Sequence, residues 1–299
     1  MLLGIAYFPP VSYFALIAKG MTIPPATPPI VYIEARESYR KQSWRNRCRI
    51  YAADGPEYLN FPIVHEGSRG IPITGIKVDY TTPWVVKTER AISSAYESSA
   101  YYDHYKDDLF AILDSRPETL FELDLRIIRF FLQKIGIQAD LRLTEDYIPA
   151  GAGGPVCAES AGGLVCAESA GGLAGSGSDE NPVGAGSPSG PRRFEPCPGK
   201  CGPEGLPVTT ADNAVTADTI ATASATGTVA TAGKYGEDYR DVLHPKRPNT
   251  VLRDLGLEKP YFQVFARKHG FIPDLSIMDL LFNEGPDSIL YLKNGISSR

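Results

Sequence analysis

The feature that most constrains this chain is a long stretch, residues 150–233, with too few large apolar side chains to build a core. It holds 17 of the chain's 29 glycines and 8 of its 25 prolines, and such a composition is typical of disordered segments. A nine-residue unit, VCAESAGGL, occurs twice in succession, at 156–164 and 165–173. Two short copies indicate duplicated low-complexity sequence, because a solenoid needs three or more longer repeats. We therefore predict a disordered insertion at 150–233.

The two flanks, residues 1–149 and 234–299, are then expected to form one domain together. An insertion of this length is tolerated because the entropic cost of closing a loop grows only with the logarithm of its length. The insertion carries eight acidic and three basic residues, so it accounts for the whole net charge of −5. The flanks are neutral, with 27 acids and 27 bases. A neutral domain offers no broad basic surface, so we expect no nucleic-acid partner.

The apolar runs of the chain are short. None approaches the roughly 18 residues that a membrane-spanning helix needs. The apolar start of the chain has no basic residues before it and is interrupted by Pro9 and Pro10, which does not fit a secretory signal peptide. We expect a cytoplasmic protein without a membrane span.

Cysteine usage agrees with a reducing compartment. Four of the five cysteines lie in the insertion: Cys157, Cys166, Cys197 and Cys201. They could hold zinc, but the spacing is loose and no histidine lies nearby, whereas structural zinc sites use tighter pairs. We predict free thiols, no disulfide framework and no metal site.

The N-terminal residues follow a strand and helix pattern. A short apolar run at 2–8 ends at a proline pair, and residues 11–19 carry apolar side chains at helical spacing. A second strand-like run follows at 30–33. This order predicts a β-α-β unit. Beyond it we predict an antiparallel meander of three strands, at 47–52, 58–63 and 73–80.

After the meander the apolar period becomes helical. Three helices are expected, at 84–98, 101–115 and 117–135. Gly136 would end the last of them, and a strand at 139–143 would return to the sheet. After the insertion we predict a strand at 261–267 and a helix at 275–282 capped by Asp274. The fold class is therefore α/β or α+β: a mixed sheet with helices packed on it, interrupted by a long disordered low-complexity insertion.

A cluster of five cations lies in a short loop before a strand, at residues 39–49. Arginine side chains bind phosphate or carboxylate with two parallel hydrogen bonds, and Tyr39 or Trp44 could stack on a base or sugar. This pattern is suited to an anionic ligand. The alternative is a solvated basic loop with a turn at Asn46.

Two further polar clusters follow the insertion. His244 precedes a proline in DVLHPK at 241–246, so its backbone is extended. Its ordinary pKa near neutrality suits a general base. The alternative is a satisfied surface histidine. Near the C-terminus, His269 is followed by a helix on which Asp279 and Asn283 lie four residues apart and share a face. These two could converge on a site, or could serve the helix and its C-terminal end.

At these residues the chain resembles the WbqC-like protein family. The resemblance is carried by five blocks: AYFPPVSYF at 6–14, YRKQSWRNRC at 39–48, DVLHPK at 241–246, PYFQVF at 260–265 and GFIPDLSIMDLLFNEGP at 270–286. It covers nearly all of the residues outside the insertion. The family pattern contains no cofactor motif, so no cofactor is assigned.

The resemblance implies a role in bacterial O-antigen or other surface polysaccharide biosynthesis, as a transferase of an acyl or aminoacyl group, including glycyl, to a sugar. The expected partners are a nucleotide-linked or carrier-linked sugar and an acyl or aminoacyl donor. His244 and Asp279 would then be catalytic, with His244 the base, while Arg45 and Arg47 would grip a phosphate. The residues expected to help orient substrate are Asn46, His269, Asp279 and Asn283. The alternative is a non-catalytic binding module of a polysaccharide assembly complex.

Overall fold

The computed structural model describes residues 1–21, 28–64, 70–149, 230–231 and 235–294. The insertion predicted at 150–233 lies outside these residues except for its last described pair, Ala230–Thr231, which forms strand β6. The disorder predicted for 150–229 and the cysteines within that range therefore stay predictions.

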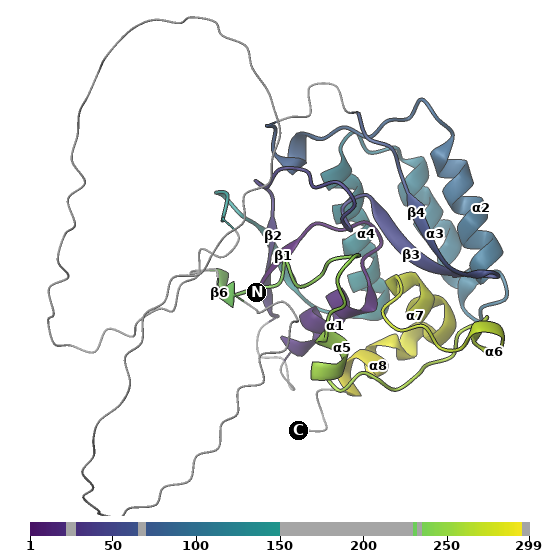
Figure 1. The fold of residues 1–299 in the computed structure, drawn as a ribbon. Coiled ribbons are helices and arrows are strands. Elements are labelled where there is room, and N and C mark those ends of the chain that lie inside the picture. The colour runs from purple at the N-terminus through teal and green to yellow at the C-terminus, as the bar shows by residue number, and fades with distance from the viewer. Residues whose placement is uncertain (22–27, 65–69, 150–229, 232–234, 295–299) are drawn as a thin grey trace, which may run out of the picture. The chain divides into compact units, whose positions relative to one another are not determined.

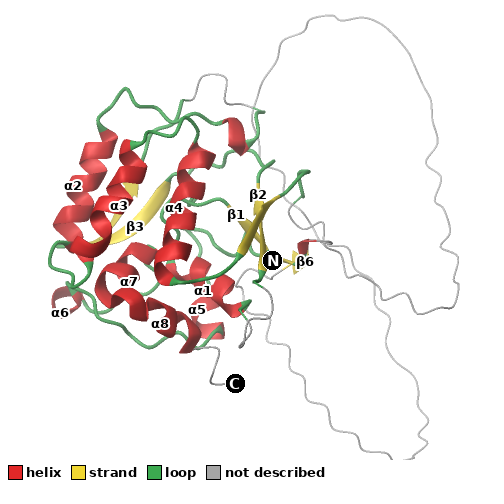
Figure 2. Cartoon of the chain, turned by 180° about the vertical axis from the view of Figure 1, so that it is seen from behind, coloured by secondary structure: helices red, strands yellow, loops and turns green. Residues whose placement is uncertain are grey.

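A five-stranded mixed sheet lies at the centre of the fold, as predicted. Its strands are β1 (Leu2–Gly4), β2 (Ile30–Glu34), β5 (Asp140–Leu143), β6 (Ala230–Thr231) and β7 (Glu237–Asp238). Their order is β5-β2-β1-β7-β6, and the first four run parallel while β6 is antiparallel to β7. Residues from both sides of the insertion thus share one sheet. Figures 1 and 2 show the helices on one side of β1 and β2.

The predicted β-α-β start is confirmed: β1 and β2 pair in parallel, and helix α1 (Val11–Lys19) connects them. α1 begins after Pro10 and has no capping side chain of its own. The backbone N–H of Ser12 instead donates to Oδ1 of Asp274 at 2.8 Å. Asp274 therefore caps α1 from far along the chain.

The prediction that Asp274 caps the following helix is wrong. Helix α7 (Ile277–Glu284) begins two residues later than expected, and Ser276 is its N-cap residue, accepting from the N–H of Met278. Asp274 has a left-handed backbone, with φ at 55°. This turns the chain before the helix and leaves the Asp274 carboxylate beside α1, where Asn249 also donates to it at 2.9 Å.

The predicted three-stranded meander is a two-stranded hairpin. Strands β3 (Arg47–Ala52) and β4 (Gly55–Asn60) pair antiparallel, and Gly55 supplies the positive φ of the turn. The third predicted strand contains a 3₁₀ turn, η1 (Ile73–Gly75), and only an isolated bridge links Val78 to Ile63. The backbone of this segment divides its hydrogen bonds between residues 62–64 and the start of the next long helix, where the N–H of Leu120 donates to the carbonyl oxygen of Ile76 at 2.9 Å.

The three predicted helices are confirmed as α2 (Trp84–Tyr96), α3 (Tyr102–Asp114) and α4 (Leu120–Ile135). α4 has a Thr119 cap that accepts from the N–H of Glu122, and Gly136 ends it with φ at 81° as expected. Its apolar stripe supplies Phe131, whose ring packs edge-on against Phe8 and Phe14 near α1.

The strand predicted at 261–267 is wrong. After α5 (Val251–Asp254) the chain runs as a loop into the short helix α6 (Ala266–His269). The loop is held by side chains rather than by a neighbouring strand. Gln263, for example, bonds both the N–H and the carbonyl of Ile272 at 2.9 Å. The chain then forms α7, η3 (Gly285–Asp287) and α8 (Ser288–Asn294).

The carboxyl group of Asp124 lies within the core and differs from the other buried acids in having no hydrogen-bond partner among the described residues. Asp124, on α4, is fully buried, and neither of its oxygens has a hydrogen-bond partner in the described part of the chain. Burial raises the pKa of this carboxyl well above its ordinary value, and Arg45 opposes the shift. Asp124 is therefore a protonated acid in the native fold over part of the pH range in which the unfolded chain is ionised.

We predict that Asp124→Asn makes the protein more stable at neutral pH. The native state of the wild type binds one more proton than the unfolded state, so its stability falls as the pH rises from 3.8 to the folded-state pKa. Each pH unit in that window costs about 1.4 kcal/mol. The amide variant lacks this loss, and urea unfolding between pH 4 and pH 8 measures the difference.

Asp107→Asn is the matched control, because Asp107 is exposed on α3. It should keep the pH dependence of the wild type. A lower stability of Asp124→Asn at pH 7 would mean that the carboxylate is ionised and held by a partner.

Candidate functional site

The most suitable place for a ligand is the edge of the sheet where β1 and β7 end. Open sheets with parallel strands bind ligands beyond the carboxyl ends of their strands, where the strand order reverses. Here β2 and β5 follow on one side of β1, and β7 lies on the other side. The basic loop 39–47 follows the neighbouring strand β2, and the segment that contains His244 follows β7. The N–H of Tyr7, just after β1, donates to the carbonyl of Trp44 in that loop at 2.8 Å.

Two buried ion pairs fix both segments at the end of β2. Glu37 accepts two hydrogen bonds from Arg45, one of them from Nε at 2.8 Å, and Glu34 accepts from Nη1 of Arg240 at 2.9 Å. Asp238 also pairs with Arg240, at 2.6 Å. Arg45, which we predict to bind substrate, is only 6% exposed and is already engaged by a carboxylate. Its contact with a substrate stays a prediction.

His244 lines a cavity of about 570 Å³, which we call the His244 cavity. Its walls come from the segments 244–258 and 271–274 and from the residues Trp44 and Arg49 near β3. Four cations line it: Arg49, Lys246, Arg247 and Arg253. Two acids, Glu258 and Asp274, also line it. The carboxylate of Asp274 already accepts a hydrogen bond from the N–H of Ser12 at the start of α1. The cavity therefore carries an excess of positive charge.

The ring of His244 is held in one tautomer when neutral. Its Nδ1 accepts from the backbone N–H of Lys246 at 3.1 Å, so the hydrogen of the neutral ring lies on Nε2. Burial lowers the pKa of His244 below its ordinary value of 6.5, and the positive charges of Arg247, Arg45 and Lys246 lower it further. His244 is thus neutral at physiological pH, and its Nε2–H can donate to a ligand.

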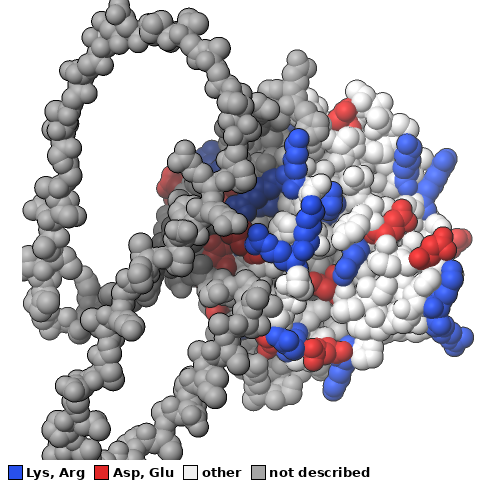
Figure 3. Space-filling view, viewed as in Figure 1, with Lys and Arg blue, Asp and Glu red and all other residues white. Residues whose placement is uncertain are grey.

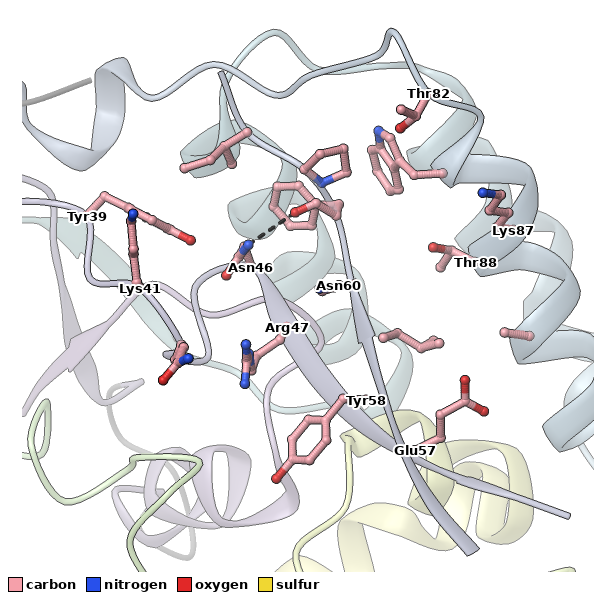
Figure 4. A pocket seen from close by; sticks show the side chains of 17 residues that line it. Tyr39, Lys41, Asn46, Arg47, Glu57, Tyr58, Asn60, Thr82, Lys87 and Thr88 are labelled. Atoms are coloured by element: carbon pink, nitrogen blue, oxygen red, sulfur yellow. Dashed lines mark hydrogen bonds between the residues drawn. The ribbon is translucent and has the colours of Figure 1, made fainter. Parts of the chain in front are cut away.

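A second cavity, of about 640 Å³, lies between the basic loop, the hairpin and α2, and we call it the Tyr58 cavity. Figure 4 shows Lys41 and Arg47 on one side, Lys87 on α2 on the other, and Tyr58 below. The predicted ligand residue Asn46 also lines it, and the Nδ2 of Asn46 donates to the carbonyl of Phe61 at 3.1 Å.

The two cavities are neighbours. The Lys246 ammonium, in the wall of the His244 cavity, bonds to Oε1 of Gln42, which lines the Tyr58 cavity. Arg47 and Arg49 are two residues apart on β3, so they share one face of the hairpin, and each lines a different cavity. Figure 3 shows lysine and arginine side chains gathered near the centre of the face towards the viewer.

The remaining predicted residues line neither cavity. His269 is exposed, and its Nε2 lies 2.9 Å from the carbonyl oxygen of Ala53. Asp279 is 1% exposed and accepts from Tyr261 at 2.6 Å and from Gln263 at 2.8 Å. Burial raises the pKa of Asp279 to about 6.

Asn283 also lies in this buried group on α7. Its Nδ2 donates to the backbone carbonyl of Asp279 at 2.7 Å, within the same helix. The shared helix face is therefore as predicted, but it does not reach the cavities. The substrate contacts of His269, Asp279 and Asn283 stay predictions.

Sequence reasoning missed several residues that line the cavities: Tyr58, Lys87, Arg247 and Arg253. Arg247 could have been found, because it follows His244 and Lys246 directly. Tyr58 gave a weaker signal, an aromatic residue between Glu57 and Leu59 in a strand-like run. Lys87 gave none, since an exposed lysine on a helix is ordinary.

The described residues contain neither a metal-binding cluster nor a membrane-spanning helix. No group of three or more histidine, cysteine, aspartate or glutamate side chains among them is arranged to hold a metal ion. No helix within the described ranges has the length and apolar character needed to cross a membrane.

A largely parallel sheet with two cation-lined cavities beyond its strand ends defines an α/β protein suited to an anionic ligand. The chain belongs to the WbqC-like protein family, which matches residues 6–155, half of its length. The match includes the basic loop and the hairpin. The blocks at 241–246, 260–265 and 270–286 lie outside it, so their resemblance to the family stays a prediction.

A similar protein is the uncharacterised Mycobacterium tuberculosis protein Rv1507c, which is 28% identical over 142 residues. That alignment covers 47% of this chain and 58% of the mycobacterial protein, so the chain spans little more than half of its relative. No solved structure matches the chain at a significant level.

We predict that His244 titrates below pH 6.5 and that Arg247→Gln raises its pKa. Burial and the neighbouring cations both disfavour the imidazolium, so removing one cation must move the pKa upward. The C2–H resonance of His244 in NMR titrations, assigned by its loss in His244→Gln, measures this.

Arg90→Gln is the control, since Arg90 is exposed on α2 and lines neither cavity. It should leave the titration of His244 unchanged. A pKa above 6.5 in the wild type would show that an acidic group dominates the surroundings of the ring.

Proposed function

We propose that this protein transfers an acyl or aminoacyl group, such as glycyl, to a sugar during synthesis of a bacterial O-antigen or other surface polysaccharide. Membership of the WbqC-like family and the resemblance of the sequence blocks support this proposal. The observation that carries it is a neutral imidazole beside four cations in the His244 cavity.

The charge of the His244 cavity fits the proposed substrates. Sugars linked to nucleotides or lipid carriers bear phosphates, and arginine forks bind phosphate with two parallel hydrogen bonds. Lys246 and Arg247 follow His244 closely in sequence and line the same cavity, so a phosphate held by them would bring the attached sugar close to the ring. Arg47 and Asn46, in the adjoining Tyr58 cavity, extend the same surface.

In the proposed reaction an amine or hydroxyl of the sugar attacks the carbonyl carbon of the acyl donor. A new C–N or C–O bond forms, and the bond from that carbon to the donor's leaving atom breaks. His244 takes the proton of the nucleophile and passes it to the leaving group. Since Nε2 carries the hydrogen of the neutral ring, the free electron pair is on Nδ1. The imidazole must therefore release the N–H of Lys246 when substrate binds.

Asp279 acts in this proposal as a positioning residue. It binds Tyr261 and Gln263, and Gln263 in turn holds the backbone of Ile272. The ring of Tyr261 packs edge-on against Phe271, which lines the His244 cavity. The buried carboxyl group thus supports one wall of the His244 cavity.

A non-catalytic binding module is the second candidate. The engagement of Nδ1 by Lys246 favours it, because the ring then offers a hydrogen-bond donor rather than a base. Such a module would bind the same phosphorylated sugar in the same cavity and release it unchanged.

We expect loss of the gene to remove an acyl or aminoacyl substituent from the surface polysaccharide while the sugar backbone is retained. General bases contribute about 10²- to 10⁴-fold to rate, so His244→Gln should restore little of the substituent. Mass spectrometry of the polysaccharide from deleted and complemented cells measures both.

His104→Gln is the matched control, since His104 is an exposed histidine on α3, and it should restore the substituent fully. Full restoration by His244→Gln would contradict the base role and favour the binding module. An unchanged polysaccharide after deletion would contradict the proposed pathway.

A further inference from the structure

We infer that the Tyr58 cavity binds the nucleoside diphosphate part of the sugar substrate, and that the sugar then extends across Arg47 and Arg49 into the His244 cavity. This inference rests on the proposed function and adds which part of the substrate each cavity holds. It selects a nucleotide-linked sugar over a lipid-linked one.

The cations of the Tyr58 cavity have no ion-pair partner within the described part of the chain. Lys41, Arg47 and Lys87 all line it, and none forms an ion pair with any acid in the described ranges. Glu57 is the one acid in the wall. Three positive charges and one negative charge leave an excess that a diphosphate would neutralise. Elsewhere on the described surface, lysines and arginines commonly pair with neighbouring carboxylates, as Lys134 does with Asp108.

Arg47 shows most directly that a partner is missing. Its Nε is buried and has no hydrogen-bond partner within the described residues. Its guanidinium lies over the Tyr58 ring, with 5.6 Å between the central carbon and the ring centroid. The ring covers one face of the guanidinium, so its N–H groups can donate only along its edges. An oxygen-rich anion satisfies such donors, whereas leaving one buried and unbonded is unfavourable.

The aromatic side chains of the cavity supply a place for a base. Tyr58 is 47% exposed, so its ring is open to a ligand, and it stands on the hairpin beside the cations. Flat heteroaromatic rings stack on such side chains. A lipid-linked pyrophosphate would provide the charge but no ring for Tyr58.

The size and the continuity of the two cavities fit an extended substrate. A volume of about 640 Å³ is in the range of sites for drug-sized ligands. Arg47 and Arg49 lie two residues apart on one face of β3, about 7 Å along the strand. A sugar attached to a diphosphate at Arg47 can therefore reach Arg49, in the wall of the His244 cavity. The bond between Gln42 and Lys246 joins the two walls at this point.

Isothermal titration with UDP, GDP, ADP and CDP, and with inorganic pyrophosphate, tests the inference on the full chain. We expect at least one nucleoside diphosphate to bind at least tenfold more tightly than pyrophosphate. Arg47→Gln should weaken that binding about ten- to hundredfold, because a charge-assisted contact is lost. Tyr58→Ala should weaken it about tenfold through lost stacking.

Two matched variants complete the design. Arg47→Lys keeps the positive charge but lacks the planar guanidinium with its parallel N–H donors, so its affinity should lie between those of Arg47→Gln and the wild type. Arg90→Gln removes an exposed cation of α2 outside both cavities and should bind like the wild type. Circular dichroism shows whether each variant is folded.

Three outcomes would overturn the inference: no binding of any of the four nucleotides, pyrophosphate binding as tightly as they do, or folded Arg47→Gln and Tyr58→Ala that both bind like the wild type. The proposed function fails separately. A lost polysaccharide substituent without nucleotide binding contradicts this inference alone, whereas nucleotide binding with an unchanged polysaccharide contradicts the transferase proposal alone.

Discussion

Two buried glutamates at the end of β2 determine where everything else in the site lies. Glu34 is fully buried and holds Arg240, and Glu37, 2% exposed, holds Arg45. Removing one partner of such a pair typically costs about 3–5 kcal/mol, because the other charge remains buried and unpaired. The loop after β2 and the segment after β7 are therefore fixed to the same strand end. This explains how residues on the two sides of the insertion form one site.

The lysines and arginines of these two segments and of the cavity walls fall into two groups. Arg45 and Arg240 face inward and meet carboxylates, so they hold the structure. The cations that line the two cavities face outward, and those of the Tyr58 cavity have no carboxylate partner in the described part of the chain. The buried ion pairs thus hold the site in place, and the cations that line the cavities can bind a ligand. The lowered pKa of His244 follows from the same crowding of cations.

Local sequence patterns correctly predicted the helices and strands whose packing partners are near in sequence. They gave wrong predictions where contacts with distant residues determine the secondary structure. The unit β1-α1-β2 and the helices α2 to α4 follow from apolar period and end signals. The segment 73–80 has strand-like residues, but its backbone bonds are divided between residues 62–64 and the start of α4, and Asp274 caps α1 instead of α7. For the site, the basic loop and His244 were visible in the sequence. The burial of Arg45 against Glu37 and the exposure of Tyr58 depend on tertiary packing, which no local pattern reveals.

In the proposed arrangement the two cavities form one substrate site, with the nucleotide at Tyr58 and the sugar at His244. Photolabelling with two analogues of the tightest-binding nucleotide sugar, one reactive on the base and one on the sugar, distinguishes this arrangement from two separate sites. We expect the base probe to label peptides containing Tyr58 or Trp84 and the sugar probe to label the segment 244–258. Labelling of one and the same peptide by both probes, or of neither cavity, would contradict it.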